Sequence, residues 1–172
     1  MKLNVNQRNY LLSLHIATGS LWFGTAMCSA ALALSFRQLR DGDVIHGINV
    51  ARSLMGEYII VPSAILTVVT GVLLCSFTNW GFFKHYWLIT KQLVTLISIV
   101  VGSVWLGPMT KDMTVISEAA RSQALQNSHY LSIQSTTAFG GVLQTLALLV
   151  IIVISTVKPW GRRKTTRRET NV

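Results

Sequence analysis

Four apolar runs, each long enough to cross a lipid bilayer, constrain this fold more than any other feature of the sequence. A membrane-spanning helix needs about 20 mostly apolar residues to cross ~30 Å of hydrocarbon. Within a bilayer only helices and closed barrels satisfy the backbone hydrogen bonds, and these runs lack the alternating pattern of barrel strands. The sequence therefore predicts an all-α, polytopic membrane protein with a four-helix transmembrane bundle over residues 1–157. The four runs are Tyr10–Phe36, Leu54–Phe77, Tyr86–Leu106 and Tyr130–Val157.

The composition excludes several classes of protein. Hydrophobic residues make up 51% of the chain and charged residues 12%, whereas a soluble domain carries about 25% charged residues. A water-soluble enzyme, a disordered chain and a nucleic-acid-binding domain are therefore excluded. Cys28 and Cys75 lie inside apolar runs and form neither a disulfide framework nor a metal-binding motif.

The distribution of lysine and arginine predicts that both termini are cytoplasmic. Outside the runs, the side that holds the termini carries nine of these residues, and the opposite side carries five. Cytoplasmic segments carry such an excess. Residues 158–172 form a basic cytoplasmic tail that holds much of the formal net charge of +9. We expect this tail to contact anionic lipid headgroups rather than nucleic acid.

Each run places small or polar residues along one helical face. Positions three, four and seven apart share a face, and polar groups inside a membrane usually point into the bundle. We therefore expect the four faces to meet in a common interior. The residues are His15, Gly19, Trp22, Ala26 and Ala30 in the first run, Glu57, Ala64, Thr67 and Gly71 in the second, Lys91, Thr95, Ser98, Gly102 and Trp105 in the third, and Thr137, Gly141 and Gln144 in the fourth.

His15 and Lys91 are expected at similar depth near the cytoplasmic side. Each lies five residues into its run, which is about 7 Å along a helix. Two interpretations of each side chain stay open. His15 either hydrogen-bonds a neighbouring helix or ligates a metal or haem. Lys91 either extends to the cytoplasmic interface or binds an anion inside the bundle.

The segments outside the runs give further expectations. Asp41–Ala51 is predicted to be a short external linker, and Thr110–Ser128 a longer connection with room for a short surface helix. Pro108 is expected to end the third span, because proline breaks a helix interior. Near the external face, Glu57 is expected to form a salt bridge with Arg52.

Short motifs in all four runs resemble families of small bacterial four-helix membrane proteins. The first run contains an H-x6-W-x-G pattern from His15 to Gly24, which resembles the first helix of CopD-like proteins and of HemJ-type protoporphyrinogen oxidases. Three further motifs, which follow one another along the chain in the same order as in the HemJ type, are similar to segments of that family. They are Pro62-Ser-Ala64-Ile-Leu-Thr67 followed by Gly71, Trp87-x3-Lys91, and Val157-Lys158-Pro159-Trp160. The run from Trp80 to Lys91 also resembles an uncharacterised group of Gram-positive membrane proteins.

The resemblance implies a multi-pass protein of the bacterial cytoplasmic membrane and, from the HemJ type, a haem b. Carried over by position, His15 would be the axial metal ligand and Lys91 the accompanying cation. Around the cofactor we expect Trp22, Thr95, Ser98 and Gln144. The predicted role is redox chemistry or sensing, because axial ligands and nearby hydrogen bonds tune haem iron.

Two other functions stay open. The protein could be a non-enzymatic transporter or partner subunit, with CopD-like metal handling and a homodimeric state. It could also bind a quinone, with His15 and Lys91 donating hydrogen bonds to a quinone carbonyl. The sequence contains no nucleophile–base pair, metalloprotease helix or nucleotide loop.

Overall fold

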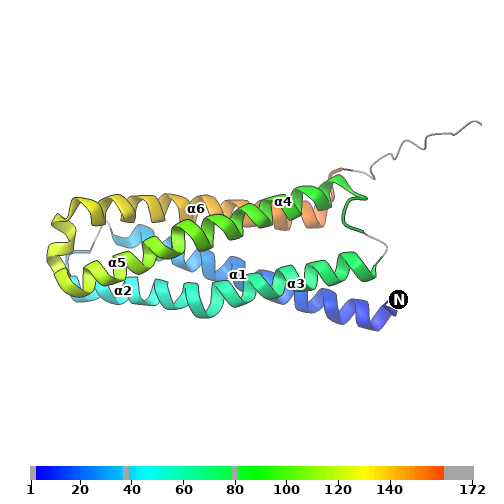
Figure 1. Ribbon diagram of the computed structural model, residues 1–172, viewed down its shortest axis with the longest axis horizontal. Coiled ribbons are helices and arrows are strands. Elements are labelled where there is room, and N and C mark those ends of the chain that lie inside the picture. The colour runs from blue at the N-terminus through cyan, green and yellow to red at the C-terminus, as the bar shows by residue number, and fades with distance from the viewer. Residues whose placement is uncertain (1–2, 37–38, 79–80, 161–172) are drawn as a thin grey trace, which may run out of the picture.

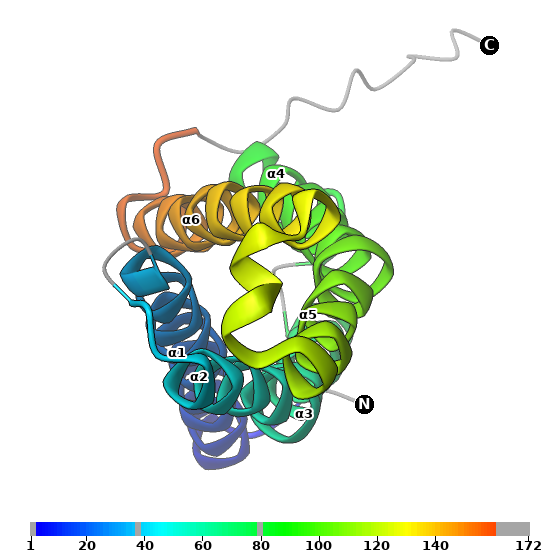
Figure 2. The same ribbon diagram turned by 90° about the vertical axis from the view of Figure 1, so that its left-hand side faces the viewer.

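Four helical rods form the ring-shaped bundle of this protein (Figures 1 and 2). The computed structural model describes residues 3–36, 39–78 and 81–160. The first rod is α1 (Val5–Ser35), and the last is α6 (Ser128–Val157). The second consists of α2 (Gly42–Met55), a π-helical segment (Gly56–Ile60) and α3 (Val61–Phe77). The third consists of α4 (Tyr86–Val100), a π-helical segment (Val101–Leu106), α5 (Gly107–Ala120) and a 3₁₀ turn (Arg121–Gln126).

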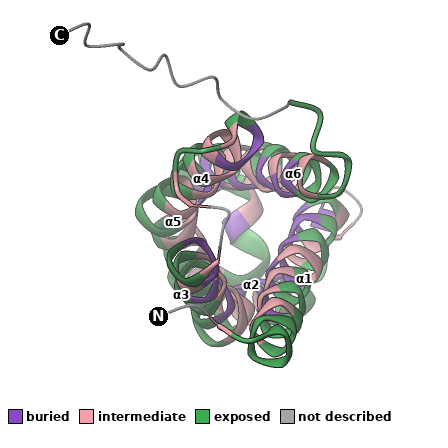
Figure 3. Cartoon of the chain, turned by 90° about the vertical axis from the view of Figure 1, so that its right-hand side faces the viewer, coloured by how far each residue is buried: buried purple, intermediate pink, exposed green. Residues whose placement is uncertain are grey.

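The predicted fold class is confirmed, because all four rods are long and apolar enough to cross a membrane. Large hydrophobic side chains cover their outer surfaces, as Leu93, Leu96 and Ile97 on α4 illustrate with exposed fractions above one half. Figure 3 shows buried residues on the faces that meet inside the bundle and exposed residues outside. The orientation of the termini stays a prediction, and residues 161–172 of the basic tail lie outside the described part.

The second and third rods extend further than the sequence predicted. The predicted linker Asp41–Ala51 is largely helical, because the Asp41 carboxylate accepts hydrogen bonds from the backbone amides of Asp43 and Val44 and begins α2. The predicted connection Thr110–Ser128 is also mostly helical, since α5 continues from α4. The prediction of a linker at Asp41–Ala51 was therefore wrong. The predicted connection at Thr110–Ser128 does contain a helix, but that helix continues the third rod.

A π-helical segment precedes a proline in both rods. The amide of Val61, just before Pro62, donates to the carbonyl of Gly56, and the amide of Gly107, just before Pro108, donates to the carbonyl of Gly102. The wider π-helical turn lets the chain pass a residue that has no amide hydrogen. Pro108 therefore begins α5 instead of ending the third span, which corrects the expectation.

The end of the bundle away from the termini has its own core. Asn49 is fully buried there, and its Nδ2 donates to the Met113 carbonyl (3.3 Å), the Ser117 hydroxyl (3.0 Å) and the Tyr130 hydroxyl (2.9 Å). The helical stretch Gly42–Phe77 has 36 residues, about 54 Å at 1.5 Å per residue, so it exceeds ~30 Å of hydrocarbon. The polar α2–α5 end is best suited to project beyond the membrane. The apolar core there contains Phe36, Ile45, Met113, Ala124, Tyr130 and Ile133.

Helix packing closes the ring on three sides of its middle section. α1 packs against α3 and α6, and α6 packs against α4. At the far end α2 packs against α5. The backbones of α3 and α4 are spaced more widely than those of the other neighbouring helices. Their side chains still meet near the termini, where Cys75 of α3 packs against Trp87 and Leu88 of α4.

Candidate functional site

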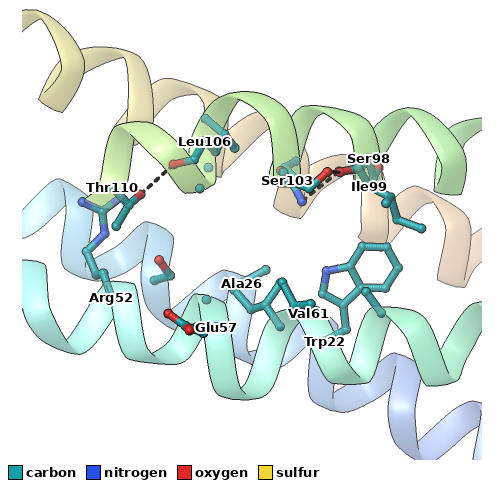
Figure 4. A pocket seen from close by; sticks show the side chains of 18 of the residues that line it. Trp22, Ala26, Arg52, Glu57, Val61, Ser98, Ile99, Ser103, Leu106 and Thr110 are labelled. Atoms are coloured by element: carbon teal, nitrogen blue, oxygen red, sulfur yellow. Dashed lines mark hydrogen bonds between the residues drawn. The ribbon is translucent and has the colours of Figure 1, made fainter. Parts of the chain in front are cut away.

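A cavity of about 830 Å³ lies between the four rods. Small residues make room for it, among them Ala26 and Ala30 on α1, Gly102 on the third rod and Gly141 on α6. The cavity extends from Trp22 at its deep end to Arg52 near the α2–α5 end (Figure 4). Its walls are mainly apolar, with Ile60, Val61, Ala64, Ile65, Val68, Val69, Ile99 and Leu106 among the lining residues.

The cavity is open toward the surface that lipid would cover. Val61, Ile65 and Val69 of α3 line the cavity and are also 46%, 57% and 47% exposed. The apolar lining of the cavity is therefore continuous with the outer surface of α3.

Three polar groups that face this apolar space are buried without a hydrogen-bond partner. They are Nε and Nη1 of Arg52, Nε1 of Trp22 and Oε1 of Gln144. Arg52 is 4% exposed and Trp22 is 3% exposed. Figure 4 places them at opposite ends of the cavity, with the indole nitrogen of Trp22 on the side that faces Arg52. Buried polar groups usually have a hydrogen-bond partner, so these three groups are the polar positions of an otherwise mainly apolar cavity.

Arg52 does not form the expected salt bridge with Glu57. The Glu57 carboxylate instead pairs with Lys111 at 3.4 Å, because the third rod faces the second across the edge of the cavity. No hydrogen bond or ion pair joins the guanidinium of Arg52 to another residue that the structure describes. The expected salt bridge between Glu57 and Arg52 was therefore wrong. Nε and Nη1 of Arg52 stay without a partner.

His15 and Lys91 meet at one level of the bundle. The Nε2 atom of His15 lies 3.4 Å from Nζ of Lys91. Its Nδ1 atom lies 3.0 Å from the Thr67 carbonyl and 2.9 Å from the Thr70 hydroxyl. Gly71 gives the imidazole room, since a Cβ atom there would lie 3.3 Å from Cε1 of His15. His15 therefore connects α1 with α3 and α4, and neither His15 nor Lys91 lines the cavity.

The structure divides the predicted site residues between two places. Trp22, Ser98 and Gln144 line the cavity, and Nε2 of Gln144 donates to the Ser98 carbonyl at 3.3 Å. Thr95 is half-buried and does not line the cavity. Trp105, expected on the inner face, is 57% exposed. The π-helical segment at Val101–Leu106 changes the helical phase, so the sequence stripe does not continue inward to this residue.

Arg52 is a cavity residue whose buried position the sequence analysis does not predict. It lies between the predicted linker Asp41–Ala51 and the predicted span Leu54–Phe77. Its signal was the apolar spacing of Ile45, Ile48 and Met55 around it, which predicts a helix with a buried face. In the described residues no three His, Cys, Asp or Glu side chains form a group that could hold a metal.

A family model described as a predicted integral membrane protein, DUF2269, matches residues 9–159. The chain belongs to the DUF2269 family. The match covers all four rods, so the bundle and the cavity both lie within the DUF2269 region. Neither the curated proteins nor the solved structures that were compared include a significant match.

Proposed function

We propose that this protein binds a lipid-soluble molecule in the cavity between its four helices. The supporting observation is the combination of apolar walls with three buried polar groups that lack partners. Small-molecule sites have this composition and measure roughly 300–1,000 Å³, a range that includes the cavity volume of about 830 Å³. This function is of the non-enzymatic class that includes transporters and partner subunits.

The opening beside α3 supports capture from the bilayer. The exposed residues Val61, Ile65 and Val69 form a continuous apolar surface from lipid into the cavity. A ligand that follows this path exchanges one apolar environment for another. Its binding energy must then come from packing and from the polar groups, because the hydrophobic effect contributes little between lipid and protein.

A plug in the cavity tests this proposal. Ala26 lines the cavity, whereas the next residue, Met27, is 50% exposed on the outer surface. Wild type, Ala26→Phe and Met27→Phe would be purified in the same mild detergent, and co-purified small molecules identified by solvent extraction and mass spectrometry. We expect a molecule near one equivalent in wild type and Met27→Phe and a loss in Ala26→Phe. Equal amounts in all three proteins would contradict the proposal.

Haem b held by His15 fits the arrangement less well. The usual haem ligands are His, Cys, Met and Tyr side chains, and none of the residues that line the cavity is of these types. Both ring nitrogens of His15 already lie within 3.4 Å of polar neighbours. Haem binding stays a prediction, which an absorption spectrum tests. A Soret band that His15→Ala removes would support it.

A quinone is a second candidate ligand because one observation favours it. The Trp22 indole N–H is buried without a partner at the deep end of the cavity, where it could donate to a quinone carbonyl. His15 and Lys91, the donors expected from the sequence, lie outside the lining. The same mass spectrum distinguishes a quinone from other lipids. CopD-like copper handling has less support, since the lining contains no Met, Cys or His ligand.

A further inference from the structure

We infer that Arg52 binds the oxyanion head of an amphiphile whose apolar chain occupies the cavity. The ligand would carry one carboxylate or phosphate group and a long hydrocarbon chain. This inference rests on the proposed function and specifies the chemical class of the ligand.

The guanidinium of Arg52 is a buried charge without a counterion. The residue is 4% exposed, and its Nε and Nη1 atoms have no partner. A buried charge is strongly unfavourable unless it is paired and hydrogen-bonded. Guanidinium groups match the geometry of carboxylate and phosphate oxygens, which they bind through two parallel hydrogen bonds.

The other charged residues that line this end do not neutralise Arg52. Glu57 pairs with Lys111 at 3.4 Å, and both side chains are more than half exposed. Asp112 lines the cavity but is exposed and is not within ion-pair distance of Arg52. Glu57 and Lys111 compensate each other, and Asp112 is exposed, so the buried part of this end carries the positive charge of Arg52 alone among these four residues.

The direction of the cavity matches that of a lipid in one leaflet. Arg52 lies beside the polar α2–α5 end, where headgroups would lie, and the lining continues along the second rod to Val69. Val69 lies 17 positions after Arg52, about 25 Å at 1.5 Å per residue. This length exceeds the ~15 Å of hydrocarbon in one leaflet, half of the ~30 Å core. An acyl chain attached to an anion at Arg52 therefore has room to extend along α3 toward Trp22.

A pair of probes that differ only in head charge tests the inference. Delipidated full-length protein would be titrated with dibromostearic acid and with its methyl ester, both of which quench tryptophan, at a pH that keeps the acid ionised. The Trp22→Phe variant identifies the part of the quenching that comes from the cavity. We expect wild type to bind the acid about tenfold or more tightly than the ester, as a charge-assisted hydrogen bond allows.

Variants at Arg52 and Lys111 assign the preference. Arg52→Met should bind acid and ester equally, and ester binding shows that this variant is folded. Arg52→Lys should retain part of the preference. Lys111→Met combined with Glu57→Gln is the control, since it removes the exposed cation at the rim without leaving an unpaired carboxylate, and it should keep the full preference. If Arg52→Met does not fold, the ratio of acid affinity to ester affinity in Arg52→Lys is compared with that in wild type. An unchanged ratio would contradict the role of Arg52.

The outcomes separate the two proposals. Equal binding of acid and ester by wild type would overturn the role of Arg52 while leaving the cavity a binding site. Quenching by neither probe, together with no effect of Ala26→Phe, would instead contradict the proposed function. Competition by phosphatidylglycerol but not phosphatidylcholine would identify a lipid phosphate as the head, and competition only by free fatty acid would identify a carboxylate.

Discussion

Single polar side chains connect the helices of this bundle at two levels. At the level of His15, one imidazole contacts the Thr67 carbonyl, the Thr70 hydroxyl and Lys91. At the far end, the amide of Asn49 contacts three groups on α5 and α6. Apolar helices in lipid gain little from the hydrophobic effect when they associate. Polar contacts such as these therefore determine how the helices align along one another.

Replacing His15 by leucine should lower the stability of the bundle. The Thr70 hydroxyl and the Lys91 ammonium would lose a partner inside the membrane, at a cost of about 1–3 kcal/mol. Thermal unfolding in detergent, followed by circular dichroism, measures the change. The neighbouring variant Ile16→Leu, on an exposed position, is the control and should unfold at the wild-type temperature. A His15→Leu protein as stable as this control would show that the contacts are not stabilising.

Replacing Asn49 by alanine should have an effect of similar size at the other end. The Ser117 and Tyr130 hydroxyls would lose their contact with a fully buried amide, again at about 1–3 kcal/mol. The exposed Gln123→Ala change in the adjacent 3₁₀ turn serves as the comparison. An Asn49→Ala midpoint no lower than that of Gln123→Ala would argue against this network.

Two of the four rods share a construction that a regular helix does not provide. In each, a glycine carbonyl accepts a π-helical hydrogen bond and a proline follows six residues after that glycine, Gly56 with Pro62 and Gly102 with Pro108. Gly56, Gly102 and Pro108 line the cavity. The widened turns therefore lie where the two rods face each other across the binding space. π-Helical turns often occur at functional sites.

The start of α2 depends on a single capping side chain. The Asp41 carboxylate accepts from the Asp43 amide at 2.8 Å and the Val44 amide at 3.3 Å. Asp41→Ala should therefore cost about 1 kcal/mol and expose the amides of the first turn. Hydrogen exchange at residues 42–45 measures this local effect. Asp43→Ala, which removes the surface pair with Arg121, should change the exchange much less, and equal effects would contradict the role of the cap.

At the scale of the whole molecule, the bundle combines a lipid-facing section with a polar end. The apolar outer surface of α3, α4 and α6 belongs in hydrocarbon, whereas the α2–α5 end carries charged pairs such as Asp43 with Arg121. The cavity lies between these two parts. Its cation is close to the polar end, and its apolar walls extend into the membrane section.

The charge distribution predicts that the α2–α5 end is external and both termini are cytoplasmic. In a protein whose Cys28 and Cys75 are replaced by alanine, we expect Gln123→Cys to react with a membrane-impermeant maleimide added to intact cells. A cysteine added after Val172 should react only after the cells are permeabilised. The reverse pattern would show that the orientation is inverted.

The sequence by itself determined the class of fold and its approximate spans. Apolar runs of about 20 residues that lack the alternating pattern of barrel strands form helices in a bilayer, so the sequence predicts the four rods. Helical spacing and equal depth also indicated that His15 and Lys91 would approach each other, and they do. The sequence did not predict the helices at Pro108 and in residues 41–51. There, packing between α2 and α5 stabilises helical structure where proline and the local composition predicted a helix end or a linker.

Only the tertiary structure decided where the binding space lies. Its position depends on two π-helical phase changes, on the wide spacing of the α3 and α4 backbones, and on the pairing of Glu57 with Lys111. None of these is a property of one segment. The guanidinium of Arg52 became the central feature of the cavity because its nearest carboxylate in the sequence pairs with a residue 54 positions further along the chain.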